Sequence, residues 1–150
     1  MLAEVVALAL ATGRRIVDPL AAEAGCRDRG VGRDQWFAAA RALEDAGLVA
    51  LQTAPPSQVV LLAATNIGIL HHLEATNFDL DGTRQRLAGV LQKTELNRPV
   101  DLAEGADAPA LLVECLLDGW VDQRLVVYSL APGRRFRIHQ FRLDARPGSP

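Results

Sequence analysis

Short helix-forming segments, each ending near a glycine and followed by strand-like segments, constrain the fold of this sequence most strongly. Three such helices are expected in the first third of the chain, over Leu2–Thr12, Pro19–Gly25 and Gln35–Ala46. Asp18 and Asp34 precede the second and third helices, where a carboxylate caps free backbone N–H groups. Gly13 and Gly47 follow the first and third helices, where left-handed backbone is needed. Between the first two helices, Ile16-Val17 is expected to be extended.

The periodicity changes after Gly47. Leu48–Gln52 and Gln58–Leu62 have strand-like sequences, separated by a turn at Thr53–Ser57. Thr65 is then placed to cap a fourth helix. In the third helix four apolar residues fall on one side and are expected to meet the core: Trp36, Phe37, Ala40 and Leu43. The pattern predicts an α+β unit that is mainly helical.

The segment Leu43–Val49, which reads LEDAGLV, is followed by the predicted hairpin and then by TNIGILHHLE. This succession resembles the winged helix-turn-helix family of DNA-binding regulators, in which a helix closes on a Gly-Leu-Val step into a two-stranded wing. The resemblance covers about the first half of the chain. It implies that helix 35–46 is a recognition helix and that the hairpin is a wing.

The second half repeats this order. Gly82–Lys93 is a predicted helix, Val100–Gly105 echoes Val17–Gly25, and Asp107 is placed to cap a further helix through Leu116. Leu116–Val121 then echoes the LEDAGLV step. A second hairpin follows over Arg124–Leu130 and Arg135–Leu143, with a Pro132-Gly133 turn.

Two readings of this repeat stay open. One is a tandem pair of winged helices, and the other is a single winged helix followed by an α+β dimerisation segment. In both, a module over residues 1–78 is followed by a second part over residues 79–146, and residues 147–150 form a disordered tail.

Composition is that of a globular protein, with 49% apolar and 23% charged residues. The longest apolar stretch, Val5–Ala11, is too short to span a bilayer and follows no basic leader. Cys26 and Cys115 are expected to be buried thiols in a reducing cytoplasm. We therefore expect a cytoplasmic, non-membrane protein.

Charge is distributed unevenly, although the net value is only −2. Residues 124–150 carry six Arg and one Asp, a balance of +5, which leaves −7 on residues 1–123. A nucleic-acid interface is expected where arginines flank the recognition helix, because guanidinium groups bind phosphates and base edges. In the first module these candidate residues are Arg14, Arg15, Arg27, Arg29, Arg33, Gln35 and Arg41.

A solvated surface with ordinary arginines is the alternative to this DNA interface. Asp28, Asp34, Glu44 and Asp45 lie close in sequence to the candidate residues and would repel phosphate. The first wing, Thr53–Ser57, carries no charge, which departs from the pattern of DNA-binding wings. For the recognition helix, the outward face is predicted to comprise Gln35, Ala38, Arg41, Ala42 and Asp45.

The second hairpin has the stronger basic pattern, with Arg134, Arg135 and Arg137 as further DNA-binding candidates. Phe136 and Ile138 alternate with these arginines, but Phe141 is out of phase, which predicts a β-bulge near His139-Gln140. Charge protecting an edge strand, or arginines paired with acids elsewhere in the chain, are the alternatives.

Catalytic and metal-binding patterns are missing from the sequence. It contains no GxSxG, P-loop, GxGxxG or HExxH motif. His71-His72 point about 100° apart on a helix, which is poor chelating geometry. Asp79 and Asp81 are better explained by helix capping than by acid–base catalysis. We therefore expect no enzymatic activity, cofactor or metal.

Two functions from different classes remain. The first is a transcriptional regulator that binds double-stranded DNA as a homodimer. Its dimer face would come from Gly82–Lys93 or from the N-terminal helix, with intrachain core as the alternative for those apolar residues; the candidates are Val5, Val6, Leu8, Leu10, Phe78 and Leu80. The second is a protein-interaction or scaffold subunit, since tandem winged helices also resemble subunits of chromosome-organising and polymerase-associated complexes.

Overall fold

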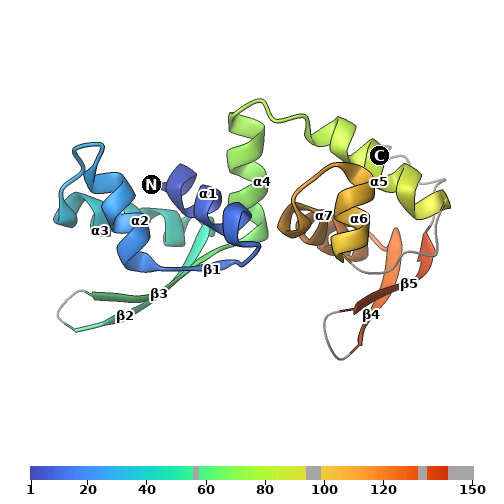
Figure 1. The fold of residues 1–150 in the computed structure, drawn as a ribbon. Coiled ribbons are helices and arrows are strands. Elements are labelled where there is room, and N and C mark those ends of the chain that lie inside the picture. The colour runs from blue at the N-terminus through green and yellow to red at the C-terminus, as the bar shows by residue number, and fades with distance from the viewer. Residues whose placement is uncertain (56–57, 94–98, 132–134, 142–150) are drawn as a thin grey trace. The chain divides into compact units, whose positions relative to one another are not determined.

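The fold of this chain is α+β and mainly helical. The structure is a computed structural model. It describes residues 1–55, 58–93, 99–131 and 135–141, without the side chains of residues 93–99 and 127–141. The chain divides into two units, Met1–Phe78 and Asp79–Pro150 (Figure 1). The first unit comprises α1 (Leu2–Thr12), β1 (Ile16–Val17), α2 (Pro19–Arg27), α3 (Arg33–Asp45), β2 (Val49–Ala54), β3 (Gln58–Ala64) and α4 (Asn66–Ala75).

Two predicted helix boundaries of the first unit are wrong. Helix α2 does not stop at Gly25 but continues to Arg27, and the chain turns at Gly30, whose φ is +84°. Gly25 instead allows close approach of α1, since a Cβ there would lie 2.9 Å from Cγ of Glu4. Asp34 is not the cap of α3. That position belongs to Gly32, whose N–H donates to Oε1 of Gln35 over 3.2 Å.

The other boundaries follow the sequence closely. Helix α1 ends at Gly13, which has φ +64°. Asp18 caps α2 by accepting a hydrogen bond from the N–H of Leu20 over 2.9 Å, and Pro19 occupies the first turn. Thr65 caps α4 by accepting from the N–H of Gly68. Capping side chains therefore define two of the four helix starts in this unit.

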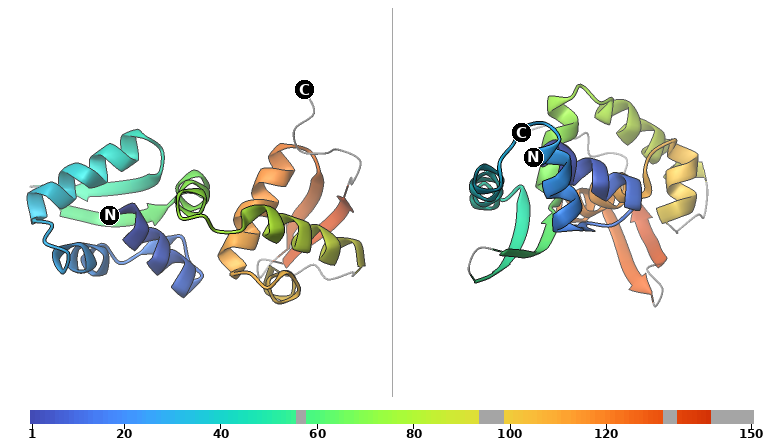
Figure 2. Two further views of the ribbon diagram at one scale, coloured as in Figure 1. Left: turned by 90° about the horizontal axis from the view of Figure 1, so that it is seen from above. Right: turned by 60° about the vertical axis from the view of Figure 1, so that its left-hand side comes forward.

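The three strands of the first unit form an antiparallel sheet in the order β1-β3-β2, so β1 and β2 are the edge strands. Ile16 lies opposite Ala63, and Val49 lies opposite Ala64. Strand β2 begins one residue later and ends two residues later than predicted. Helix α3 lies alongside β2 (Figure 2). The buried core between helices and sheet comprises Val5, Val6, Ala9, Val17, Ala22, Cys26, Trp36, Ala40, Val49, Leu62, Ala64 and Ile69.

Helix α4 packs closely on the corner where α3 turns into β2. The Thr65 hydroxyl lies 2.7 Å from the carbonyl oxygen of Gly47 and 3.0 Å from that of Leu48. The Thr65 N–H also donates to the Leu48 carbonyl, over 3.3 Å. Gly68 permits this approach, because a Cβ at that position would overlap the Leu48 carbonyl oxygen and lie 2.8 Å from its carbon. The corner therefore requires glycine at position 68.

The second unit comprises α5 (Leu80–Lys93), α6 (Pro99–Ala106), α7 (Ala110–Asp122), β4 (Val126–Ala131) and β5 (Arg135–Phe141). Asp79 starts α5 by accepting a hydrogen bond from the N–H of Gly82 over 2.9 Å, as expected for a capping carboxylate. Helix α5 therefore begins at Leu80, two residues before the predicted start. Both strands form one antiparallel hairpin.

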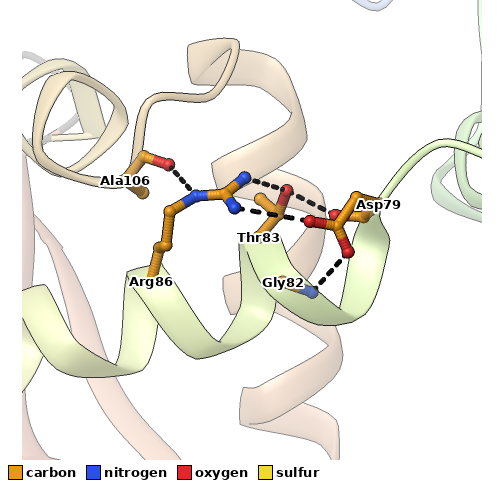
Figure 3. Close-up of polar contacts among 5 residues, drawn as sticks. All are labelled: Asp79, Gly82, Thr83, Arg86 and Ala106. Atoms are coloured by element: carbon orange, nitrogen blue, oxygen red, sulfur yellow. Dashed lines mark hydrogen bonds and ion pairs between the residues drawn. The ribbon is translucent and has the colours of Figure 1, made fainter.

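Arg86 joins α5 to the end of α6 (Figure 3). Its Nε donates to the carbonyl oxygen of Ala106 over 3.0 Å, and its Nη2 donates to Oγ1 of Thr83 over 2.9 Å. The Thr83 hydroxyl, which is fully buried, donates in turn to the carbonyl oxygen of Asp79 over 2.8 Å. Arg86 also pairs with the Asp79 carboxylate over 3.4 Å. This network fixes the first turns of α5 against α6.

Helix α7 is buried along most of its length. Seven of its thirteen residues are buried: Leu111, Leu112, Val113, Cys115, Leu116, Leu117 and Trp120. The prediction that Asp107 caps this helix is wrong. Asp107 adopts left-handed backbone with φ +49°, and Pro109 holds the capping position. The turn after α6 therefore occurs where the sequence suggested a helix start.

The second hairpin contains the predicted bulge. Val127 lies opposite Gln140, but the next residue, Tyr128, lies opposite Ile138. His139 has no partner in this register, which confirms the bulge near His139-Gln140 and accounts for the changed phase of Phe141. The predicted strand start at Arg124 is wrong, because Arg124 adopts left-handed backbone with φ +57° and β4 begins at Val126. Leu143 and the predicted tail lie outside the described residues.

The same turn geometry occurs twice, 77 residues apart. Helices α3 and α7 both have 13 residues, and start at Arg33 and Ala110. After α3, the N–H of Leu48 donates to the Leu43 carbonyl, and after α7 the N–H of Leu125 donates to the Trp120 carbonyl. Both are Schellman turns.

Four residues with positive φ follow the same spacing: Gly30 and Gly47 in the first unit correspond to Asp107 and Arg124 in the second. The positive φ values of Gly13 and Asn77 have no such counterpart among the described residues. The counterpart of Leu43–Val49 is therefore Trp120–Val126, and the predicted counterpart, Leu116–Val121, is wrong by four residues. The sequence misled because Gly119 looks like a closing glycine but lies inside α7.

No helix in the described ranges combines the length and the apolar character that crossing a bilayer demands.

Candidate nucleic-acid interface

The outward face of α3 is the one that the sequence predicted. All five of its predicted members are exposed: Gln35, Ala38, Arg41, Ala42 and Asp45. Trp36 and Ala40 on the opposite side are buried, and Phe37 and Leu43 are half-buried. The amphipathic pattern therefore oriented this helix correctly.

The two polar side chains expected to read bases are engaged within the protein. Gln35 accepts the capping hydrogen bond from Gly32. Arg41 pairs with Glu44 over 2.8 Å and donates to Oγ1 of Thr53 over 3.2 Å. Its guanidinium also lies 5.6 Å from the centre of the Phe37 ring. To contact a base, Arg41 would have to give up its interactions with Glu44, Thr53 and Phe37.

The arginines at the end of α2 and in the loop after it are paired with carboxylates. Arg29 lies 2.6 Å from Glu4 of α1, and Arg27 lies 3.5 Å from Glu23 one turn earlier. These guanidinium groups are more than 60% exposed, so each pair contributes at most about 1 kcal/mol and can rearrange. Their main effect is to place negative charge beside each candidate phosphate contact.

Sequence spacing could have revealed some of these pairs but not all. Glu23 and Arg27 have i,i+4 spacing, and Arg41 and Glu44 have i,i+3 spacing, which both favour pairing on a helix. Glu4 lies 25 residues from Arg29 and gives no such signal. Tertiary packing of α1 on α2 brings that pair together.

The remaining candidates of the first unit lie at two separate places. Arg15 is half-buried and donates to Oδ1 of Asn66, which ties β1 to the first turn of α4. Arg14, beside it, is exposed. Arg33 is exposed at the start of α3. Neither Arg14 nor Arg33 forms a side-chain hydrogen bond or ion pair within the described part of the chain.

The second hairpin is described only in its backbone. Arg135 lies opposite Ala131 and Arg137 lies opposite Ser129. Arg134 lies outside the described residues, as does the tip of the first wing at residues 56–57. Contacts of Arg134, Arg135 and Arg137 with DNA therefore stay predictions.

The net charge of the two helix pairs α2–α3 and α6–α7 decides what these pairs can attract. Residues 19–45, which span α2 and α3, contain four Arg and five acidic residues. Residues 99–122, which span α6 and α7, contain six acidic residues and no basic residue. The resulting balances of −1 and −6 disfavour a phosphate backbone at both segments.

The remaining residues that could bind a metal ion or react are the histidines, the cysteines and the carboxylates. Over the residues that the structure describes, no three His, Cys, Asp or Glu side chains gather to hold a metal ion. Cys26 and Cys115 are buried free thiols, as expected. His71 is exposed and His72 half-buried on α4.

Three of the six apolar residues proposed for a dimer face belong to the core. Val5 and Val6 have no exposed surface, and Leu80 is 4% exposed. Leu8 and Leu10 are half-buried, whereas Phe78 is 38% exposed. On α1 the intrachain-core alternative therefore holds for Val5 and Val6, and a dimer face there stays a prediction that would rest on the half-buried Leu8 and Leu10.

Comparisons with protein-family models, with curated proteins and with solved structures find no match for this chain.

Proposed function

We propose that this chain is a non-catalytic protein-interaction module built from two winged-helix-like units, and that its helical surfaces bind a protein rather than duplex DNA. The architecture is supported by the turns and left-handed residues that recur 77 positions apart. In both units two helices precede a hairpin, with the second helix closed by a Schellman turn. This is the order that the winged-helix resemblance implies.

The negative charge of α6 and α7 is the main support for protein binding over DNA binding. Six carboxylates without a basic residue create a local potential that repels the DNA backbone. Helix α7 stands where a recognition helix would, yet most of its residues are buried. A helix in this state can neither enter a major groove nor tolerate phosphates beside it.

The first unit supports the same conclusion less strongly. Its helix α3 exposes two alanines and Asp45. The two side chains expected to contact bases, Gln35 and Arg41, already form hydrogen bonds or ion pairs within the protein. Small side chains on an exposed helix allow close approach of another protein surface. Duplex DNA would find one unpaired guanidinium on this helix within the described part, that of Arg33.

DNA binding remains the second candidate because of the +5 balance of residues 124–150. A basic hairpin of this kind binds phosphates without reading sequence, with dissociation constants of about 10⁻⁴ to 10⁻⁶ M. Such binding would weaken steeply with salt, and it would depend on Arg135 rather than on Arg33.

Fluorescence anisotropy of a labelled duplex, titrated with the full chain at several salt concentrations, separates the two candidates. We expect no binding that depends on the helices, so Arg33→Ala should leave the isotherm unchanged, and any weak binding should fall with Arg135→Ala. Tight binding that Arg33→Ala weakens would contradict the proposal. A protein that stays cross-linked to the tagged chain in stoichiometric amount after nuclease treatment would support it.

A further inference from the structure

The three most exposed large apolar side chains of the first unit lie in β1 and in the first turns of α2 and α4. Leu20 is 70% exposed, Ile67 is 64% exposed and Ile16 is 61% exposed. Ile16 lies in β1 and Leu20 lies in the first turn of α2, which follows β1 directly. Ile67 lies in the first turn of α4, which the Arg15–Asn66 hydrogen bond ties to β1. We call these three residues the β1 patch.

Isolated exposed apolar residues need no explanation, but a group of them on adjoining elements marks an interaction surface. The patch also adjoins an open sheet edge, since β1 pairs only with β3 in the described sheet. A two-residue edge strand is too short to drive pairing alone. Apolar burial would therefore have to supply most of the stability.

Opposite charges lie on either side of Ile16. Exposure alternates along this segment, with Arg14, Ile16 and Asp18 exposed and Val17 buried. Strand β1 itself comprises Ile16 and Val17. A cation lies two residues before Ile16 and an anion two residues after it, so opposite charges flank the strand at equal spacing. Within the described part of the chain, neither Arg14 nor Asp18 has an ion-pair partner.

We infer that the β1 patch is the contact surface of a symmetric homodimer, in which two β1 segments lie antiparallel about a two-fold axis at Ile16. Antiparallel alignment places Arg14 of one copy opposite Asp18 of the other, and the symmetry produces this pair twice. A parallel alignment would instead oppose like charges. The Ile16, Leu20 and Ile67 side chains of both copies then supply the apolar contact.

This surface differs from the dimer faces that the sequence suggested, in which Val5, Val6 and Leu80 are buried. It also stands apart from the proposed function, because a symmetric dimer could bind either a protein or DNA. Mass measured in solution reports on the dimer, whereas anisotropy with duplex reports on the function. Failure of one inference therefore leaves the other unaffected.

Sedimentation equilibrium of the full chain over a range of concentrations tests the inference. We expect a reversible monomer–dimer equilibrium for the unchanged chain. Ile16→Lys should raise the dimer dissociation constant by at least about tenfold, since two apolar side chains leave the interface. Val100→Lys is the matched control, because Val100 is 66% exposed in the second unit and should leave dissociation unchanged.

A charge series tests the alignment separately. Arg14→Glu replaces two attractive pairs by two repulsive ones and should raise the dissociation constant about tenfold. Adding Asp18→Asn removes that repulsion while keeping a capping residue, and should recover part of the loss. Circular dichroism and tryptophan fluorescence check that each variant is folded.

A chain that sediments as a monomer at every concentration would overturn the inference. So would a dimer whose dissociation is unchanged by both Ile16→Lys and Arg14→Glu.

Discussion

Gly68→Ala should destabilise the first unit by about 3 kcal/mol. The added methyl group would overlap the Leu48 carbonyl, so α4 must move away from the corner between α3 and β2. Overpacking of this kind costs about 1–3 kcal/mol. Moving α4 also weakens the hydrogen bonds that Thr65 donates from its hydroxyl to Gly47 and from its N–H to Leu48, at about 1 kcal/mol each. The higher helix propensity of alanine offsets about 1 kcal/mol of this loss.

Urea denaturation followed by tryptophan fluorescence measures this change. The chain has two tryptophans, Trp36 in the first unit and Trp120 in the second, so a Trp120→Phe background makes Trp36 the reporter of the first unit. Trp36 is 3% exposed, and its emission should shift when the unit unfolds.

Gly89→Ala is the matched control for a helical glycine. A Cβ at Gly89 in α5 would meet no atom within 4 Å, so this substitution should stabilise the second unit by up to about 1 kcal/mol. Its unfolding is followed by Trp120 in a Trp36→Phe background. If the Gly68→Ala variant had the same free energy of unfolding as the unchanged chain, the close packing of α4 on the α3–β2 corner would be refuted.

Further predictions concern the turns and the networks. Thr65→Ala should destabilise the first unit by about 1–2 kcal/mol in the same urea assay, whereas Thr65→Ser, which keeps the hydroxyl, should lose much less; equal losses would argue against a capping role. Arg86→Met should destabilise the second unit by about 1–2 kcal/mol, because the Ala106 carbonyl and Thr83 lose their donor. Arg84→Met, whose ion-pair partner Asp81 is exposed, should change stability by less than about 0.5 kcal/mol. Arg124→Gly should stabilise the second unit by about 0.5–1 kcal/mol in a thermal melt, since a left-handed position favours glycine; destabilisation would contradict the φ of that turn.

Local sequence signals predicted most of the first unit. Asp18, Thr65 and Gly13 marked helix ends because capping depends on side chains adjacent in sequence. The bulge at His139 could be predicted because its effect on side-chain phase is visible in the sequence. These features need no information from distant parts of the chain.

The failures have equally physical causes. Gly25 and Gly119 resemble helix stops, but the first allows close approach of Glu4 and the second lies within α7. Arg124 takes left-handed backbone although only Gly, Asn and Asp adopt it readily, and Asp107, which can adopt it, was instead expected to cap a helix. Tertiary structure decided these positions.

For the candidate interface, the exposed face of α3 was predictable and its electrostatics were not. Period-3.6 spacing identified the exposed residues, but the partners of Arg29 and Arg15 come from α1 and α4. The burial of α7 was also hidden, since three acidic residues occur among its apolar ones.

Amide chemical-shift mapping of the labelled full chain, titrated with duplex DNA at low salt, tests most directly whether the helices avoid nucleic acid. The proposed function predicts that the amide signals of Arg33–Asp45 and Ala110–Asp122 stay unchanged with excess duplex, even if signals of residues 124–141 move. Saturable shifts along the exposed face of α3 would contradict it.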